Sequence, residues 1–201
     1  RTRPYVPAHQ TTANFLKGMA AIQDNRLLDA IAILEAELDD SPCRGLAIGN
    51  AGLALLRLEQ FEDANKRIVE ADDHFNQHGC PHPPSWVQLK RNHAEAIARS
   101  RPQEALLCFN RAINFARDLV IIHDAFRQSI EIEIAYTFNS WGAILLRLES
   151  PDAALGCFQK AKDIYRKYDT ESKVGLAETL TNSSHALRCI GNKTGAGLAL
   201  Q

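Results

Sequence analysis

Three histidines and a cysteine near the middle of the chain are the residues best suited to bind a metal ion. His74 and His78 are four residues apart, so they would share one face of a helix end, and Cys80 and His82 follow closely. Imidazole nitrogens and a thiolate are ligands that zinc accepts in a tetrahedral site. The spacing matches none of the common zinc modules, however, and no second cysteine pair is present. A polar helix end followed by a proline-stiffened turn is the competing interpretation, and we expect no metal or other cofactor.

His185 and Cys189 are the other pair that could do chemistry, because a thiolate beside a histidine is a nucleophile. They are four residues apart on one helix, but a helical pair of this kind has no oxyanion hole. Cys189 also precedes Ile190 and the Gly191 turn, which is typical of packing. No glycine-rich phosphate loop follows a strand. We therefore expect no enzyme within these residues, although a catalytic domain elsewhere in a longer chain remains open.

The elements that would carry these side chains are marked by an alanine that returns in one local context. The recurring alanines are Ala30, Ala64, Ala105, Ala154 and Ala196. The intervals between them are 34, 41, 49 and 42 residues. Such intervals are typical of helical repeat arrays. A small residue precedes four of them by twelve: Gly18, Gly52, Gly142 and Ser184. A large residue follows each by four: Leu34, Ile68, Phe109, Phe158 and Leu200. The pattern predicts paired helices that cross closely at the small residues.

The stretches NAGLALLRLEQFEDA (Asn50 to Ala64) and NSWGAILLRLESPDAALGCFQKA (Asn139 to Ala161) resemble the helix–turn–helix motif of the tetratricopeptide repeat (TPR) family. The resemblance covers about residues 11–201 and implies an all-α fold, a right-handed α-solenoid of antiparallel helix pairs. It implies a linker at residues 1–10 and repeats at about 11–44, 45–78, 86–119, 128–168 and 170–201, the last truncated. The longer intervals resemble the long-helix variant repeats of signalling and regulatory proteins.

Three places depart from this pattern. Glu37 replaces the expected small residue of the first repeat, which suits a terminal pair with one exposed side. His93 occupies the small position of the third repeat, where its imidazole must loosen the crossing or find a polar partner. Asn76 to Trp86 contains three prolines and a glycine, and we expect a loop there. We also expect this chain to be a segment of a longer protein.

Charge and composition exclude several classes of function. The 201 residues carry a formal net charge of −1, so no whole-chain field attracts nucleic acid or an anionic membrane. No window of about 18 uninterrupted apolar residues is present. The five cysteines are odd in number and widely scattered, which is typical of buried core residues in a reducing compartment. We therefore predict a cytoplasmic protein that binds neither nucleic acid nor membranes.

In TPR arrays the first helix of each pair lines a concave groove, so the resemblance implies which side chains contact a ligand. The polar members of this set are Asn50, Arg57, Lys90, Arg91, Asn139, Arg147, Asn182 and Arg188. The others are Leu53, Ala94, Ile97, Tyr136, Ala143 and His185. An asparagine can pin a peptide backbone because it offers both a donor and an acceptor. Arginine suits the carboxylates of an acidic peptide or a chain terminus.

Two function classes follow. The first is a protein–protein interaction scaffold whose basic groove holds a peptide or helix of a partner. The alternative is a sensor or regulatory domain of a larger signalling effector, such as a protease, a transcription regulator or a nucleotide-switch protein. In that case the array would contact other domains of the same chain. The sequence before Arg1 and after Gln201 would separate the two.

Overall fold

The computed structural model describes residues 12–37, 41–168 and 173–191, which form α-helices, turns and one short 3₁₀ segment, with no β-strand among them. The chain divides into two compact units, and the division falls between Ala105 and Leu106. The recurring Ala196 and its follower Leu200 lie outside the described residues.

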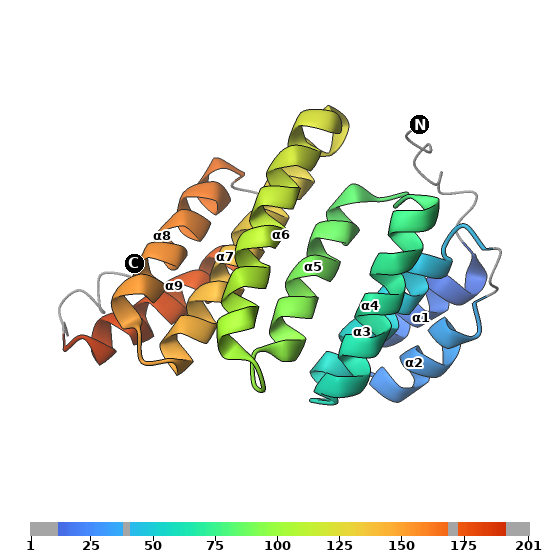
Figure 1. Ribbon diagram of the computed structural model, residues 1–201, viewed down its shortest axis with the longest axis horizontal. Helices are drawn as coiled ribbons and strands as arrows, with labels where there is room; N and C mark the ends of the chain where they lie inside the picture. The colour runs from blue at the N-terminus through green and yellow to red at the C-terminus, as the bar shows by residue number, and fades with distance from the viewer. Residues whose placement is uncertain (1–11, 38–40, 169–172, 192–201) are drawn as a thin grey trace. The chain divides into compact units, whose positions relative to one another are not determined.

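The described part of the first unit is built from α-helices (Figure 1). They are α1 (Ala13–Gln23), α2 (Leu27–Glu35), α3 (Arg44–Arg57), α4 (Phe61–His78), α5 (Pro83–Ile97) and the start of α6 (Pro102–Ile122). Each of the first four helices contacts the next one. In addition, α1 contacts α3, and α3 contacts α5. The first helices of successive pairs therefore form one layer of this unit.

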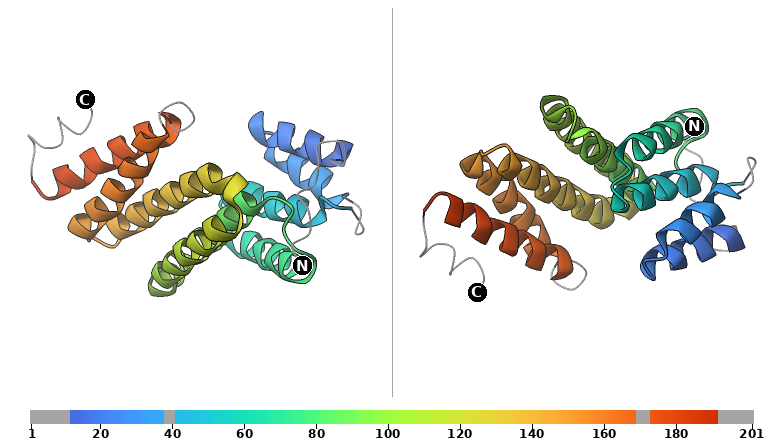
Figure 2. Two further views of the ribbon diagram at one scale, coloured as in Figure 1. Left: turned by 90° about the horizontal axis from the view of Figure 1, so that it is seen from above. Right: turned by 90° about the horizontal axis from the view of Figure 1, so that it is seen from below.

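The second unit contains the rest of α6, the 3₁₀ segment η2 (Asp124–Phe126), α7 (Arg127–Arg147), α8 (Pro151–Lys167) and α9 (Lys173–Cys189). Helix α8 contacts both α7 and α9, and α7 also contacts α9. Figure 2 shows α8 and α9 (orange and red) side by side, as it shows α1 and α2 (blue) within the first unit. Helices α6 and α7 have 21 residues each, whereas α1 has 11 and α2 has 9. The extra residues of the longer intervals thus lengthen helices.

The recurring alanine and its companions lie where the paired helices cross, as the sequence predicts. The alanines in the described residues have no exposed surface: Ala30, Ala64, Ala105 and Ala154. A Cβ atom on Gly18 would lie 2.5 Å from Leu34 Cδ2, and one on Gly142 would lie 2.8 Å from two ring atoms of Phe158. Carbon atoms do not approach this closely in a packed interior. Glycine is therefore needed opposite the large residue of the following helix.

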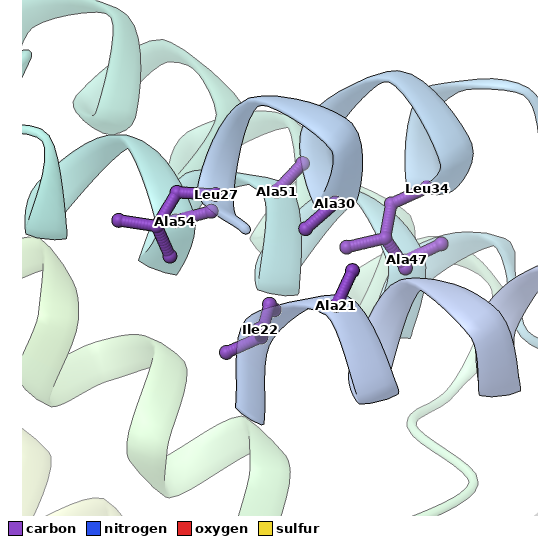
Figure 3. Packing of buried hydrophobic residues seen from close by; sticks show 8 residues of the cluster. All are labelled: Ala21, Ile22, Leu27, Ala30, Leu34, Ala47, Ala51 and Ala54. Atoms are coloured by element: carbon purple, nitrogen blue, oxygen red, sulfur yellow. The ribbon is translucent and has the colours of Figure 1, made fainter. Parts of the chain in front are cut away.

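Figure 3 shows the core of the first unit, where three helices meet through small side chains. The cluster comprises Ala21 and Ile22 of α1, Leu27, Ala30 and Leu34 of α2, and Ala47, Ala51 and Ala54 of α3. Because an alanine side chain is a single methyl group, the backbones of these helices can approach closely. The larger Ile22, Leu27 and Leu34 fill the space that remains.

The turns after α1, α3 and α7 share one backbone conformation. Asn25, Glu59 and Glu149 have positive φ angles of 58°, 59° and 54°, and each precedes the recurring alanine by five residues. The next residue donates its N–H back to the helix that is ending: Arg26 to Ala21 O at 2.8 Å, Gln60 to Leu55 O at 3.0 Å and Ser150 to Leu145 O at 2.9 Å. This is the Schellman arrangement, which satisfies carbonyl groups at a helix end and usually contains glycine.

The connection between α4 and α5 is shorter than the loop expected over Asn76 to Trp86. Helix α4 continues to His78 and α5 begins at Pro83, so only residues 79–82 connect them. Pro83 and Pro84 occupy the first positions of α5. A proline is tolerated there because its missing N–H has no partner within the helix anyway. Two of the three prolines therefore start a helix.

Glu37 is buried, so the expectation that it lies on an exposed side is wrong. It is only 5% exposed, and its Oε2 accepts a hydrogen bond of 2.6 Å from Thr12 Oγ1. The Thr12 oxygen in turn accepts the N–H of Phe15 at 3.2 Å and caps the N-terminus of α1. A carboxylate near a helix N-terminus is stabilised by the helix dipole. This contact connects α1 to the residues that follow α2.

Replacing Thr12 with valine is expected to lower the free energy of unfolding of the first unit by about 1–3 kcal/mol, because α1 loses its cap and Glu37 loses its donor. Thr12→Ser, which keeps the hydroxyl, is the matched control and should remain close to the parent protein. Urea unfolding followed by circular dichroism measures both. Equal stabilities of the valine and serine variants would contradict this role of Thr12.

Candidate functional site

The four candidate zinc ligands are not assembled into a metal site. The rings of His74 and His78 lie 4.6 Å apart between centroids. Cys80 turns elsewhere and donates its thiol proton to His82 O at 3.2 Å, and burial raises the pKa of this thiol to about 12. His82 Nδ1 lies 2.7 Å from Ser85 Oγ. Within the described ranges no group of three or more His, Cys, Asp or Glu side chains could hold a metal ion.

The cysteines do not all occupy the core. Cys43 and Cys157 are buried, as expected, whereas Cys80 and Cys108 are partly exposed. Cys189 is exposed at the end of α9, so the expectation that it packs inside is wrong. His185, its helical neighbour one turn earlier, is exposed as well. The apolar residues that would pack over this end of α9 in a complete repeat lie beyond the described part of the chain.

Helix α3 presents Asn50 and Arg57 on the layer of first helices. Asn50 is partly exposed, and its Nδ2 donates to Leu46 O at 2.8 Å. Arg57 is exposed, and its Nη1 lies 3.4 Å from the carbonyl oxygen of Ile22 near the end of α1. The guanidinium group therefore donates a hydrogen bond to a carbonyl group near the end of α1 and remains accessible to solvent.

The expected cations of α5, in contrast, are engaged within the unit. Lys90 Nζ forms a 2.7 Å ion pair with Asp72 Oδ2 of α4, and Asp72 Oδ1 accepts the indole N–H of Trp86 at 2.7 Å. Arg91 is largely buried, with 12% of its side chain exposed, and its Nε lies 3.7 Å from Glu95 Oε1. The sequence pattern gives no indication of the Lys90–Asp72 contact between α4 and α5, because the two residues are 18 positions apart along the chain.

A small hollow lies between α3 and α5 in the layer of first helices. It is lined by Gly45, Leu46, Gly49, Asn50, Phe75, Ser85, Gln88, Leu89 and Asn92. Asn92 is only 2% exposed, yet its Oδ1 has no hydrogen-bond partner. Buried polar atoms in folded proteins are nearly always hydrogen-bonded, so such an exception calls for an explanation.

Sequence reasoning missed Asn92 and Gln88 as members of this surface. Asn92 follows Asn50 by 42 residues, close to the 41 that separate Ala64 from Ala105. That near-repeat was the signal available. This spacing was overlooked because the ligand-contacting positions implied by the TPR resemblance are Lys90 and Arg91 on α5, and not Gln88 and Asn92.

In the second unit, the candidate asparagines pair with each other. Asn182 of α9 donates from Nδ2 to Oδ1 of Asn139 on α7 at 3.1 Å, and Asn139 is 5% exposed. Arg147 and Arg188 are both exposed. Arg188 Nη2 lies 3.2 Å from Ser184 Oγ one turn earlier on α9. This unit therefore offers exposed cations on its first helices, together with two asparagines that are hydrogen-bonded to each other.

Burial lowers the pKa of three histidines in the first unit: His74, His82 and His93. Their surroundings differ. The Nδ1 atoms of His74 and His93 are buried without a hydrogen-bond partner, so the polar partner suggested for His93 is not found at this atom. All three histidines are therefore favoured in the neutral form in the folded protein.

The free energy of unfolding of the first unit is expected to fall as the pH falls below about 6.5. An unfolded histidine titrates near that pH, and the folded-state pKa values are lower, so the unfolded chain binds more protons in this range. The stabilisation is complete above the unfolded pKa and is lost on acidification towards the folded values. Urea unfolding at about pH 7.5 and 5.5 measures the difference, and His93→Gln should reduce it. Higher stability at the lower pH would contradict this assignment.

No helix in the described ranges is long and apolar enough to cross a membrane.

Comparison with known proteins identifies the fold only through solved structures. No protein-family model and no curated protein matches the sequence. A crystal structure of a Rap protein complexed with competence and sporulation factor is similar at a TM-score of 0.77 and 16% identity, over 92% of this chain and 50% of that one. The apo form of RapI gives 0.64 and 18%, over 92% of this chain and 66% of that one.

The crystal structure of a putative kinesin light chain of Podosopora anserina with nearly identical TPR-like repeats gives a TM-score of 0.59 and 14% identity. That match covers 94% of this chain and 90% of that one. In contrast, this chain spans only half the length of the Rap protein in the complex and about two thirds of the length of RapI. The fold is that of the TPR-like helical repeat proteins, as the sequence predicts.

Proposed function

We propose that this chain is a protein-interaction scaffold that binds a peptide or helix of a partner on the faces of its first helices. The observation that carries the proposal is the narrow hollow between α3 and α5, with its buried Asn92 whose Oδ1 has no hydrogen-bond partner. A bound ligand would supply the missing partner. Similarity to a Rap structure complexed with competence and sporulation factor supports a binding role for this fold. We expect a non-catalytic role for this segment.

The exposed cations suggest how a ligand is held outside the hollow. Arg57 in the first unit, and Arg147 and Arg188 in the second, are exposed on first helices. Guanidinium groups bind carboxylates through paired hydrogen bonds, so acidic residues of a partner are expected to contact these arginines. The formal net charge of −1 gives no general attraction to nucleic acid or membranes, and we propose a cytoplasmic protein or peptide partner.

A second candidate is a regulatory domain that contacts other domains of the same, longer chain. This chain matches only half of the Rap structure to which it is similar, and that coverage is the observation in favour. Catalytic or DNA-binding motifs in the sequence before Arg1 or after Gln201 would favour it. An isolated array would favour the scaffold.

The test is selection of ligands from a display library of random peptides on the full chain. We expect enriched peptides that bind the parent protein and lose about tenfold or more in affinity with Asn50→Leu or Arg147→Glu. The matched controls lie on second helices: Asn76→Leu on α4 and Arg166→Glu on α8, both exposed. The controls should bind normally. Failure to enrich any peptide, or loss of binding in the control variants alone, would refute the proposal.

A further inference from the structure

Two of the four histidine and cysteine candidates share one surface of α4, although the four do not form a zinc site. His74 and His78 lie one turn apart at the end of this helix, and both line an open surface depression of about 720 Å³. We propose that this pair binds a divalent late transition metal, Cu²⁺ or Ni²⁺, through its two Nε2 atoms, with water completing the coordination shell. The site lies on a second helix and is independent of peptide binding by the first helices.

The separation of the two rings suits a pair of neighbouring ligands on one ion. Their centroids are 4.6 Å apart, and their planes are inclined by 31°. Two imidazoles that bind one ion through nitrogen at about 2.0–2.1 Å have centroids about 4.5 Å apart at a right angle and about 5.2 Å apart at a tetrahedral angle. The observed separation is closer to the right angle, which is typical of the square-planar or tetragonal sites of Cu²⁺ and Ni²⁺.

His78 has the tautomer of a metal ligand. Its Nδ1 lies 3.2 Å from the carbonyl oxygen of His74. Because a carbonyl oxygen can only accept a hydrogen bond, Nδ1 carries the proton, and the lone pair of the neutral ring is on Nε2. Metal-bound histidines commonly donate their other ring N–H to a backbone carbonyl in this way, which fixes both the tautomer and the orientation of the ring.

His74 directs its Nε2 edge away from α3. Its Nδ1 is buried at that helix, where a Cβ atom on Gly45 would lie 2.7 Å away, and it has no hydrogen-bond partner among the described residues. Burial, together with the charges of His78 and Arg44, lowers the pKa of this ring and favours the neutral form that binds metals. Nε2 is therefore the nitrogen available to an ion. Moving the ring proton to Nδ1 breaks no hydrogen bond within the described part of the protein.

The depression has room for the water molecules of a partly hydrated ion. Its charged lining consists of two acidic and two basic side chains: Glu70, Asp73, Arg44 and Lys66. Their formal charges cancel, so binding depends on the imidazole nitrogens and not on a general field. No group of three or more His, Cys, Asp or Glu side chains in the described ranges could hold an ion, so the protein supplies two ligands here. Imidazole ligands favour Cu²⁺ and Ni²⁺ over Mg²⁺, which prefers oxygen.

The experiment titrates the full chain with NiCl₂ and locates the ion by paramagnetic broadening of the backbone amide signals in NMR spectra. Ni²⁺ is the probe because Cu²⁺ can oxidise the exposed thiol of Cys189. We expect saturable broadening centred on the last turn of α4, and no competition by MgCl₂. His78→Gln should weaken binding about tenfold or more, because one of the two imidazoles is lost. His78 is exposed, so this variant should fold, as circular dichroism will check.

A matched variant keeps the number of histidines and changes only their spacing. His78→Gln combined with Asn76→His places the second ring on the opposite side of α4 from His74, so tight binding should not return. His185→Gln on α9 should leave the broadening at α4 unchanged. Equal affinities of the parent chain and His78→Gln, recovery of binding in the double variant, or broadening confined to the end of α9 would each overturn the inference. Peptide selection does not involve these histidines, so the two proposals fail separately.

Discussion

Phe158→Ala is expected to lower the free energy of unfolding of the second unit by about 3–5 kcal/mol, the cost of truncating a fully buried phenylalanine. Phe158 has no exposed surface and packs with Ala154 of its own helix and Ala186 of α9. The cavity would open at the crossing where α7, α8 and α9 meet, and neighbouring helices cannot close it without losing their own contacts.

Hydrogen exchange resolved along the chain is the suitable measurement, because it reports the second unit separately from the first. Protection in α7, α8 and α9 should fall while protection in α1 to α4 is retained. Phe61→Ala is the matched control, since Phe61 is partly exposed and has Arg99 stacked over its ring at 4.6 Å. If Phe158→Ala lowered protection from hydrogen exchange no more than Phe61→Ala does, the assignment of Phe158 to the core would be contradicted.

Gly142→Ala is expected to destabilise the same unit by about 1–3 kcal/mol although alanine is the better helix former. The added Cβ would lie 2.8 Å from two ring atoms of Phe158, which is buried and has no free space to move into. Gly156 on α8 is the matched control, because it is exposed and a Cβ there meets nothing within 4 Å. Gly156→Ala should stabilise by about 0.5–1 kcal/mol.

A double variant separates steric contact from a general effect on the helix. Gly142→Ala combined with Phe158→Leu should be more stable than the sum of the two single changes predicts, because the smaller side chain makes room for the new methyl group. Urea unfolding of the two single variants and the double variant measures this coupling. Strict additivity, or stabilisation by Gly142→Ala alone, would contradict a close crossing at this glycine.

The helices could be predicted because their signals lie at fixed distances along the chain. The recurring alanine, the glycine twelve residues before it and the large residue four after it meet at the crossings, as for Gly142, Ala154 and Phe158. The turns could not be predicted in the same way. Glu59 and Glu149 have positive φ angles, a conformation that usually requires glycine. The geometry of the helix pair that each turn joins explains this conformation.

The placement of several candidate residues on first helices could be predicted from the sequence, and their role in binding stays a prediction. Asn50, Arg57, Arg147 and Arg188 lie on first helices with at least partial exposure. Lys90 forms an ion pair with Asp72 of α4, a contact between helices that spacing along the chain does not encode, whereas Arg91 and Glu95 lie at the i,i+4 spacing of one helix. Asn92 was also missed because an asparagine on a helix looks ordinary until its burial and the lack of a partner for its Oδ1 are known.

We propose that a ligand binds on the faces of the first helices, and within them at the hollow between α3 and α5. The most direct measurement is the side-chain NH₂ spectrum of the full chain titrated with a peptide selected from the random library. We expect the signals of Asn50, Gln88 and Asn92 to shift and saturate together, while those of Asn76 and Gln77 on α4 stay in place. Shifts at Asn76 and Gln77, with the signals of the hollow unchanged, would contradict it.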